Sequence, residues 1–175
     1  MMADQCDDIS QIGRLLALAQ AGADIVCPSR YCPGGAQLLN SPLRTKAWIP
    51  RTAGRLLQWL SGLPTADPTN SFKLYSAAML RRLRLCSTFS FSVTLEIVAK
   101  AYGLGYRIVE VPTVWRDRQH GKSNFKVGRS IITYLPWFGA ALLRGRLLRL
   151  PVAWLQAWWT VSAPVAANEM VPEHA

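Results

Sequence analysis

Residues 7–27, with the sequence DDISQIGRLLALAQAGADIVC, place a helical pattern directly before a short apolar run. Asp7 and Asp8 can cap the start of a helix, and Gly22 can end it. The apolar residues between them recur at helical spacing: Ile9, Ile12, Leu15, Leu16 and Leu18. The run from Asp24 to Cys27 that follows is typical of a buried strand. A helix followed so closely by a strand predicts an α/β layered fold.

Outward from this unit, the chain alternates further helical and extended patterns. Helices are predicted at about 51–61, 77–84 and 93–102. Strands are predicted at 72–75 and 107–115, the second being rich in β-branched residues. Proline is rare at central ladder positions, so Pro112 indicates that the second strand lies at an edge or contains a bulge.

The charge of the chain is strongly positive and clustered. Its 20 basic and 10 acidic residues among 175 give a net charge of +10. No acidic residue occurs between residues 25 and 66 or between residues 118 and 168. Such a field attracts anions, which include phosphorylated substrates, anionic lipid head groups and nucleic acid. No nucleic-acid motif or basic–aromatic platform accompanies the charge, which argues against a nucleic-acid partner.

The cysteines and the N-terminus give signals of a different kind. The four cysteines form no CxxC pair and have no histidine at zinc spacing, which predicts reduced thiols in a cytosolic protein. The first residues, MMADQCDD, lack the basic and apolar regions of a signal peptide.

The C-terminal third is rich in leucine and tryptophan. The run 131–143 is interrupted by Pro136, and the run 147–161 contains Trp154, Trp158 and Trp159. Neither run reaches the roughly 20 apolar residues that span a bilayer. Arginines beside the tryptophans favour amphipathic helices that lie in the head-group layer of a membrane. The alternative is that these helices pack on the sheet as part of the core.

Four segments, read in order, resemble a known enzyme family. They are Met2–Asp4 before Asp7; CPSRY, residues 27–31, before Pro33–Gly35; DPTNSFKLY, residues 67–75; and VPTVWRDRQHGKSNF, residues 111–125. In this combination they resemble the dolichyl- and polyprenyl-phosphate sugar synthases of glycosyltransferase family 2, of the dolichyl-phosphate mannosyltransferase type. The resemblance covers most of residues 1–126.

The resemblance implies an α/β fold that is the C-terminal part of a GT-A glycosyltransferase fold. It implies inverting transfer of a sugar from a GDP- or UDP-linked nucleotide sugar to a polyprenyl phosphate, by a peripheral protein at the cytoplasmic face of a membrane. It also implies a divalent metal, Mg²⁺ or Mn²⁺, with Asp4 as a ligand. Met2 stands where the family's motif has its first aspartate, and a thioether is a poor ligand for these hard ions.

The same resemblance assigns roles to individual residues. Arg118 and Asp4 take the catalytic positions, and the acceptor phosphate falls to Arg30, Arg51, Lys46 and Ser123. Arginine suits this task because its planar fork can hold phosphate through two hydrogen bonds. Asp67 is expected to cap a turn and His120 to be an exposed loop residue, and no chemical role is predicted for Glu96.

Three parts are expected along the chain: a metal- and acceptor-binding part of the catalytic domain at 1–127, amphipathic helices at 128–162 and a loose tail at 163–175. The family's first half, which grips the nucleotide, has no counterpart here, so the chain is expected to be an N-terminally truncated piece of the transferase. One alternative is a non-catalytic membrane-surface module that retains lipid-phosphate binding. A nucleic-acid binder is a further alternative, suggested by charge alone.

Overall fold

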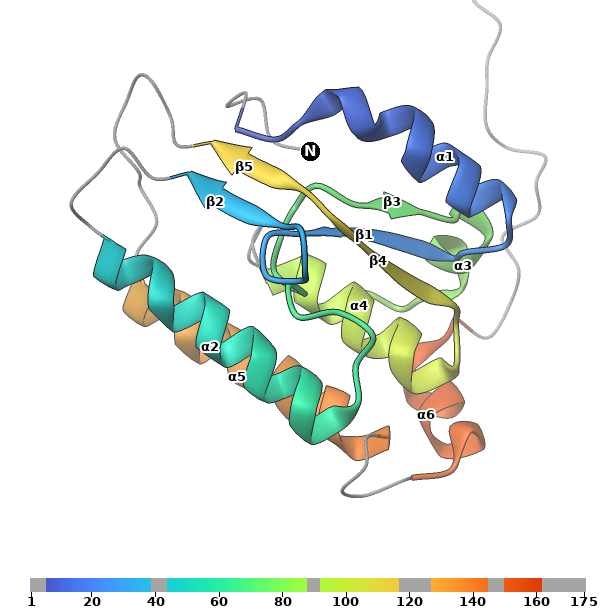
Figure 1. Ribbon diagram of the computed structural model, residues 1–175. Coiled ribbons are helices and arrows are strands. Elements are labelled where there is room, and N and C mark those ends of the chain that lie inside the picture. The colour runs from blue at the N-terminus through green and yellow to red at the C-terminus, as the bar shows by residue number, and fades with distance from the viewer. Residues whose placement is uncertain (1–5, 39–43, 88–91, 117–126, 145–149, 162–175) are drawn as a thin grey trace, which may run out of the picture.

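The computed structural model describes residues 6–38, 44–87, 92–116, 127–144 and 150–161, without the side chains of 44–47, 127–131 and 144. These residues form an α/β fold, as the sequence predicted (Figure 1). The helices are a 3₁₀ turn at Ile9–Gln11, α1 (Ile12–Gln20), α2 (Arg44–Ser61), α3 (Ala77–Arg82), α4 (Ser92–Leu104), α5 (Val127–Arg144) and α6 (Val152–Trp159). The strands are β1 (Ile25–Ser29), β2 (Ala36–Leu38), β3 (Leu74–Tyr75), β4 (Ile108–Pro112) and β5 (Val114–Arg116).

Strand β1 lies at the centre of a three-stranded sheet with the order β3-β1-β4. It pairs antiparallel with β3 and parallel with β4, in a register that sets Ile25 opposite Ile108 and Ser29 opposite Pro112. Strands β2 and β5 form a separate parallel pair. Thr113 connects the two sheets, because its N–H donates to the carbonyl of Ser29 and its carbonyl accepts from the N–H of Ala36, both at 3.0 Å.

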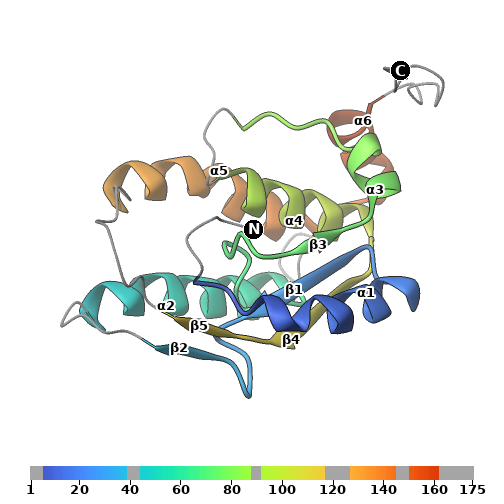
Figure 2. The ribbon, with the colours of Figure 1, turned by 90° about the horizontal axis from the view of Figure 1, so that it is seen from above.

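Helices cover both faces of this sheet (Figures 1 and 2). Successive side chains of a strand point to opposite faces. Val26 accordingly packs with Leu15 of α1 on one face, whereas Ile25 and Cys27 join the larger core formed with α2, α4 and α5 on the other. All five residues of β1 are buried, as expected for a strand covered on both faces.

A buried ion pair fixes the loop after α3 to helix α4. The Nζ of Lys100 lies 2.6 Å from Oε1 of Glu96, one turn away on the helix. The Glu96 carboxylate also accepts hydrogen bonds of 2.7 Å from the backbone N–H groups of Cys86 and Ser87. Burial acts to raise the pKa of Glu96, but these hydrogen bonds outweigh it and lower the pKa. Glu96, for which the sequence predicted no chemical role, therefore holds the α3–α4 connection in place.

Two of the differences from the sequence-based expectation involve proline. Helix α2 begins at Arg44 rather than near 51, because Pro50 is accommodated inside it at the loss of one backbone hydrogen bond. The predicted strand 107–115 is divided between β4 and β5 at Thr113. Pro112 is the last residue of β4, an edge strand of its sheet, as the sequence predicted.

The expectation of amphipathic C-terminal helices is wrong for the residues that the structure describes. Helix α5 packs one face into the core through Ala140 and Ala141, but its other face exposes Ile132 and Leu135 rather than polar groups. Helix α6 likewise buries Leu155 and exposes two tryptophans. Among the residues whose side chains are described, the exposed faces of both helices are therefore mostly apolar. Within the described ranges, no helix combines the length and the apolar character needed to cross a membrane.

Gly103 sets the distance between α4 and α6, since a Cβ at this position would collide with the indole ring of Trp159. Replacing Gly103 with alanine should therefore lower the free energy of unfolding by about 1–3 kcal/mol, the usual cost of overpacking. The matched control is Gly139→Ala in α5, where a Cβ would meet no atom within 4 Å. That change should be neutral or stabilising by about 0.5–1 kcal/mol, because alanine favours a helix interior. Urea denaturation followed by circular dichroism measures both; equal effects would contradict the packing.

Candidate anion-binding site

The candidate site lies where the parallel strands β1 and β4 both end. Ligands of open α/β sheets bind outside the carboxyl ends of the strands, where loops leave the sheet. Beyond β1 the chain turns sharply: Oγ of Ser29 accepts from the backbone N–H groups of Tyr31 and Cys32, both at 3.2 Å. Gly35 makes the turn possible, because a Cβ there would collide with the Ser29 carbonyl. The turn places Arg30 and Tyr31 at the strand end.

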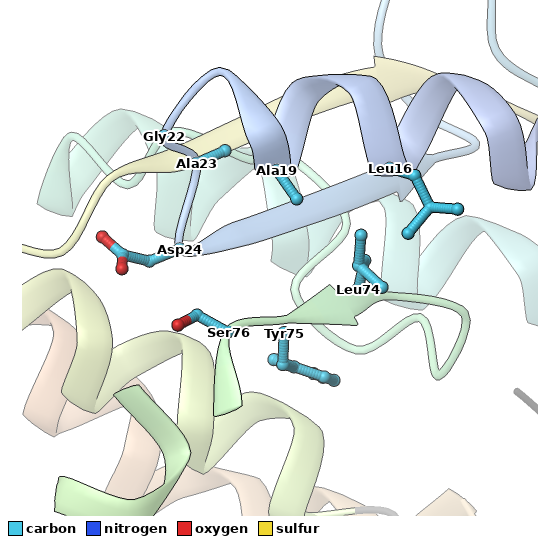
Figure 3. Close-up of a pocket in the computed structure, with 8 residues that line it drawn as sticks. All are labelled: Leu16, Ala19, Gly22, Ala23, Asp24, Leu74, Tyr75 and Ser76. Atoms are coloured by element: carbon cyan, nitrogen blue, oxygen red, sulfur yellow. The ribbon is translucent and has the colours of Figure 1, made fainter. Parts of the chain in front are cut away.

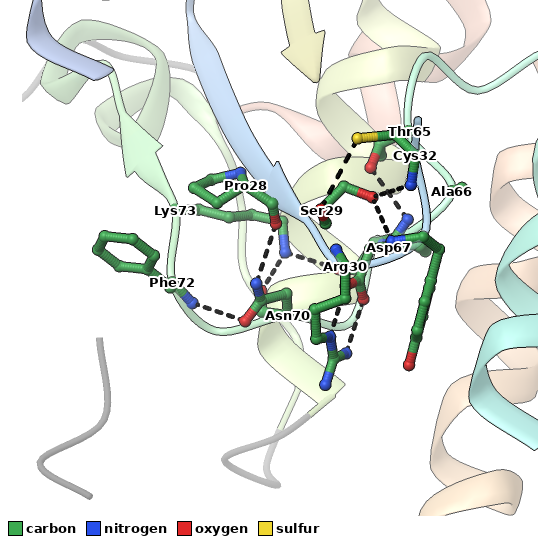
Figure 4. A network of polar contacts seen from close by, with 12 residues as sticks. Pro28, Ser29, Arg30, Cys32, Thr65, Ala66, Asp67, Asn70, Phe72 and Lys73 are labelled. Atoms are coloured by element: carbon green, nitrogen blue, oxygen red, sulfur yellow. Dashed lines mark hydrogen bonds and ion pairs between the residues drawn. The ribbon is translucent and has the colours of Figure 1, made fainter. Parts of the chain in front are cut away.

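Arg30 is held by a buried carboxylate from the loop between α2 and β3 (Figure 4). Its Nε and Nη2 donate to the two oxygens of Asp67 at 2.7 and 2.8 Å, and its backbone N–H donates to the same carboxylate at 3.1 Å. Asp67 is fully buried, and the Arg30 side chain is 14% exposed. Burial acts to lower the pKa of Arg30, but the hydrogen bonds and charge of Asp67 raise it above its ordinary value. Arg30 is therefore a fixed cation whose position is set by Asp67.

The loop that supplies Asp67 is itself tied to both neighbouring strands. Glu110 of β4 accepts from the hydroxyl of Thr65 at 2.9 Å and from the N–H of Ala66 at 2.7 Å. Asn70 donates to the carbonyl of Pro28 in β1 at 2.9 Å. The buried Lys73 donates to carbonyls of the same loop, and burial lowers its pKa (Figure 4). The loop is thus a firm support for the ion pair rather than an independent turn.

Helix α2 brings two more arginines to the same place. Arg51 and Arg55 lie one turn apart, so they share a face of the helix. Nη2 of Arg55 donates to the carbonyl of Tyr31 at 3.1 Å. Arg51 is exposed, forms no hydrogen bond or ion pair to another described residue, and lies near enough for its charge to act on the Tyr31 hydroxyl. Gly54, between them, lets α2 approach the supporting loop, because a Cβ there would collide with the carbonyl of Ala66.

The structure thus brings together two of the predicted phosphate-binding residues, Arg30 and Arg51. Lys46 lies in α2, but its side chain is outside the described part, as are Asp4, Arg118, Ser123 and His120 entirely. The sequence analysis missed Arg55, although its spacing of four from Arg51 on a predicted helix was a usable signal. It also expected Asp67 to cap a turn, whereas its side chain pairs with Arg30. A pairing across 37 positions leaves no local pattern.

The described residues do not supply a metal site. In the ranges with described placement, no group of three or more His, Cys, Asp or Glu side chains could hold a metal ion. Cys6, next to the predicted motif, is buried and carries a soft thiol, which suits Mg²⁺ or Mn²⁺ poorly. A pocket of about 440 Å³ between α1 and β3 lies at the opposite end of β1 and is lined mainly by apolar groups (Figure 3). The arginines that converge beyond the end of β1 indicate that the ligand of the candidate site is an anion.

Two curated proteins share sequence with nearly the whole chain. A polyprenol monophosphomannose synthase of Mycolicibacterium smegmatis is 29% identical over 154 residues, which are 85% of this chain and 56% of that protein. An undecaprenyl-phosphate mannosyltransferase of Micrococcus luteus is 31% identical over 157 residues, which are 86% of this chain and 63% of that protein. The resemblance to polyprenyl-phosphate sugar synthases is confirmed.

The similarity covers only part of each relative. The chain spans somewhat more than half the length of these relatives. No protein-family model matches it. The similarity nevertheless covers 85–86% of the chain, so it includes most of the elements that build the candidate site.

Removing the Asp67 charge should show how far the site depends on the buried ion pair. We expect Asp67→Asn to lower the free energy of unfolding by about 3–5 kcal/mol, because Arg30 would remain buried without its partner. The matched control is Asp8→Asn, since Asp8 caps the first helical turn at the surface and asparagine caps nearly as well. Thermal and urea denaturation measure both variants. A loss below about 1 kcal/mol for Asp67→Asn would mean that the pair does not hold the strand end.

Proposed function

We propose that this chain binds the phosphate of a polyprenyl phosphate for a glycosyltransferase that draws its sugar from a nucleotide sugar. The convergence of Arg30, Arg51 and Arg55 beyond the end of β1 carries this proposal. The names of the two relatives support it, since both refer to mannose and to a polyprenyl or undecaprenyl phosphate. They favour mannose as the sugar; the nucleotide is GDP or UDP.

The chemistry of the acceptor matches such a site. A phosphate monoester carries about −1.5 to −2 charges near neutral pH and is already nucleophilic. In the proposed reaction, an acceptor phosphate oxygen attacks the anomeric carbon, and the bond from that carbon to the nucleotide diphosphate breaks. The diphosphate leaves with the bonding electron pair, and the configuration at the carbon inverts. The arginines position the anionic acceptor beside the anionic donor and reduce their repulsion.

The remaining predicted residues complete the proposal. Arg118 and Asp4 are the proposed catalytic residues, and Ser123 and Lys46 are further phosphate ligands. Mg²⁺ or Mn²⁺ at Asp4 would neutralise the leaving diphosphate. No step of the proposed reaction is derived from that ion. The proposal rests on the arginines that would bind the acceptor phosphate: Arg30, Arg51 and Arg55.

The surface next to the arginines suits a lipid-linked acceptor. Helix α2, which carries Arg51 and Arg55, also exposes Trp48 and Trp59, at 67% and 69% of their surface. Helix α5 lies beside α2 and exposes Ile132 and Leu135 (Figure 1). Tryptophan and arginine together are typical of segments at a membrane–water interface. We therefore place the protein peripherally on a membrane, at its cytoplasmic face.

A second candidate is a non-catalytic module that binds lipid phosphate at a membrane surface. The observation that favours it is the cationic end of β1 in a chain that has Met2 where the family's metal motif has its first aspartate. It predicts the same binding as the transferase but no chemical turnover. Incubation with radiolabelled GDP-mannose or UDP-glucose and a polyprenyl phosphate separates the two, since only the transferase yields a labelled lipid. Binding without labelled lipid would favour the module.

Arg51→Ala should weaken binding of a short-chain polyprenyl monophosphate in detergent micelles by about 10-fold or more, since a hydrogen bond to a charged group contributes roughly 1.5–3 kcal/mol. Arg51 is exposed and has no described hydrogen-bond partner, so the fold should be unaffected. The control is Arg14→Ala, which removes an arginine that is also exposed, from α1 on the other side of the sheet. Fluorescence titration or microscale thermophoresis gives the dissociation constants.

The uncharged polyprenol provides the matching ligand control. It should bind Arg51→Ala and the unchanged protein alike, because it lacks the phosphate. Equal losses of polyprenyl monophosphate binding in Arg14→Ala and Arg51→Ala would indicate general charge attraction and would contradict the site.

A further inference from the structure

The hydroxyl group of Tyr31 is buried without a hydrogen-bond partner among the residues that the structure describes. Buried polar atoms in folded proteins are nearly always hydrogen-bonded, and one that is not loses its interaction with water without replacement. The residue as a whole is 5% exposed. The phenol therefore lies where a partner from outside the described chain would satisfy it.

The groups around Tyr31 are mostly cations. The guanidinium of Arg30 lies 4.9 Å from the centre of the Tyr31 ring, and Arg55 donates to the Tyr31 carbonyl. Burial raises the pKa of Tyr31 to about 12; the charges of Arg30 and Arg51 act against this rise, and that of Asp67 adds to it. The phenol consequently remains protonated, and hence a donor, at neutral pH.

These surroundings restrict what the missing partner can be. A guanidinium has only donors, so none of the three arginines can accept the phenol proton. The Asp67 carboxylate already accepts three hydrogen bonds from Arg30. The hydrogen-bond acceptor that these cations favour most is an anionic oxygen. The exposed Arg51 can bind the same anion.

A second tyrosine shows that an unpartnered hydroxyl alone would not carry this conclusion. Tyr75 in β3 also has a buried hydroxyl without a described partner. Its pKa is raised by burial and by Cys27, and none of the described arginines acts on it. It lies at the other end of β1, paired with Ile25. Tyr75 is therefore a matched control that has the buried phenol but not the cations.

We infer that the Tyr31 hydroxyl donates a hydrogen bond to an oxygen of the anion that Arg51 and Arg55 attract, a phosphate monoester. This inference rests on the proposed function and adds a neutral donor to a site otherwise made of charges. A neutral donor distinguishes ligands by geometry, because it contributes only when an oxygen lies at hydrogen-bond distance, whereas a charge acts over a longer range. Tyr31 is thus a phosphate-binding residue that recognises the position of the phosphate.

The test compares Tyr31→Phe with Tyr75→Phe, since both changes remove one buried hydroxyl and keep the ring. Thermal unfolding is measured with increasing inorganic phosphate, against sodium chloride of equal ionic strength. We expect phosphate to stabilise the unchanged protein and Tyr75→Phe equally. In Tyr31→Phe the affinity for phosphate should fall by about 10-fold or more, in line with the loss of a hydrogen bond to a charged group, which contributes roughly 1.5–3 kcal/mol. Without phosphate this variant should unfold at the same or a higher temperature, because it loses an unsatisfied group.

The same variants are titrated with polyprenyl monophosphate in micelles, which separates a lipid-linked phosphate from the free ion. A loss confined to the lipid phosphate in Tyr31→Phe also supports the inference. Unchanged binding of both ligands by Tyr31→Phe, with a loss in Arg51→Ala, would overturn the role of Tyr31 and leave the proposed function standing. No binding of either ligand by the unchanged protein would overturn both.

Discussion

The structure depends on strand β1, which is hydrogen-bonded on both sides and covered by helices on both faces. Its five residues are completely buried, so each of its side chains has to match a core on one side of the sheet or the other. The antiparallel strand β3 and the parallel strand β4 take their register from it. The elements of the candidate site are placed in turn by where β1 ends.

The site combines a buried ion pair, Arg30 with Asp67, with the exposed arginine Arg51, which is available to bind a ligand. Arg30 and Asp67 form a closed pair, so the Asp67 carboxylate offsets part of the charge that Arg30 brings to a ligand. Its effect is to fix the strand end and the loop on which the neighbouring groups rely. Arg51 lies outside that pair and keeps its full charge for a ligand. Because Arg30 pairs with Asp67 and Arg51 does not, the site can be rigid and still have a cation available to bind a ligand.

Much of the fold could be predicted from the sequence because its signals are local. The helix from Ile12, the strand from Ile25 and the edge position of Pro112 each follow from spacing or residue type within a short window. The start of α2 could not, since tertiary packing stabilises a helix around Pro50 that local propensity disfavours. The faces that the C-terminal helices expose could not be predicted in the same way, because they are set by how α5 and α6 pack on α4.

The site was predictable only in part, and the reason is similar. Arg30 and Arg51 came from a family resemblance, which marks positions but not the contacts that they make. The roles of Asp67 and Tyr31 depend on neighbours that are distant in sequence. The Asp67 carboxylate pairs with Arg30, and the Tyr31 phenol lies near the arginines of helix α2. A pairing of this kind has no periodicity and no motif, so it appears only when the chain is folded.

Gly54 illustrates a constraint that a survey of charged residues would overlook. It has no side chain, and this absence sets how close α2 lies to the carbonyl of Ala66. Any larger residue would shift the helix that carries Arg51 and Arg55 while leaving every charge in the sequence unchanged. Among related proteins, replacement of this glycine would therefore indicate a loss of anion binding even in sequences that keep all of the arginines.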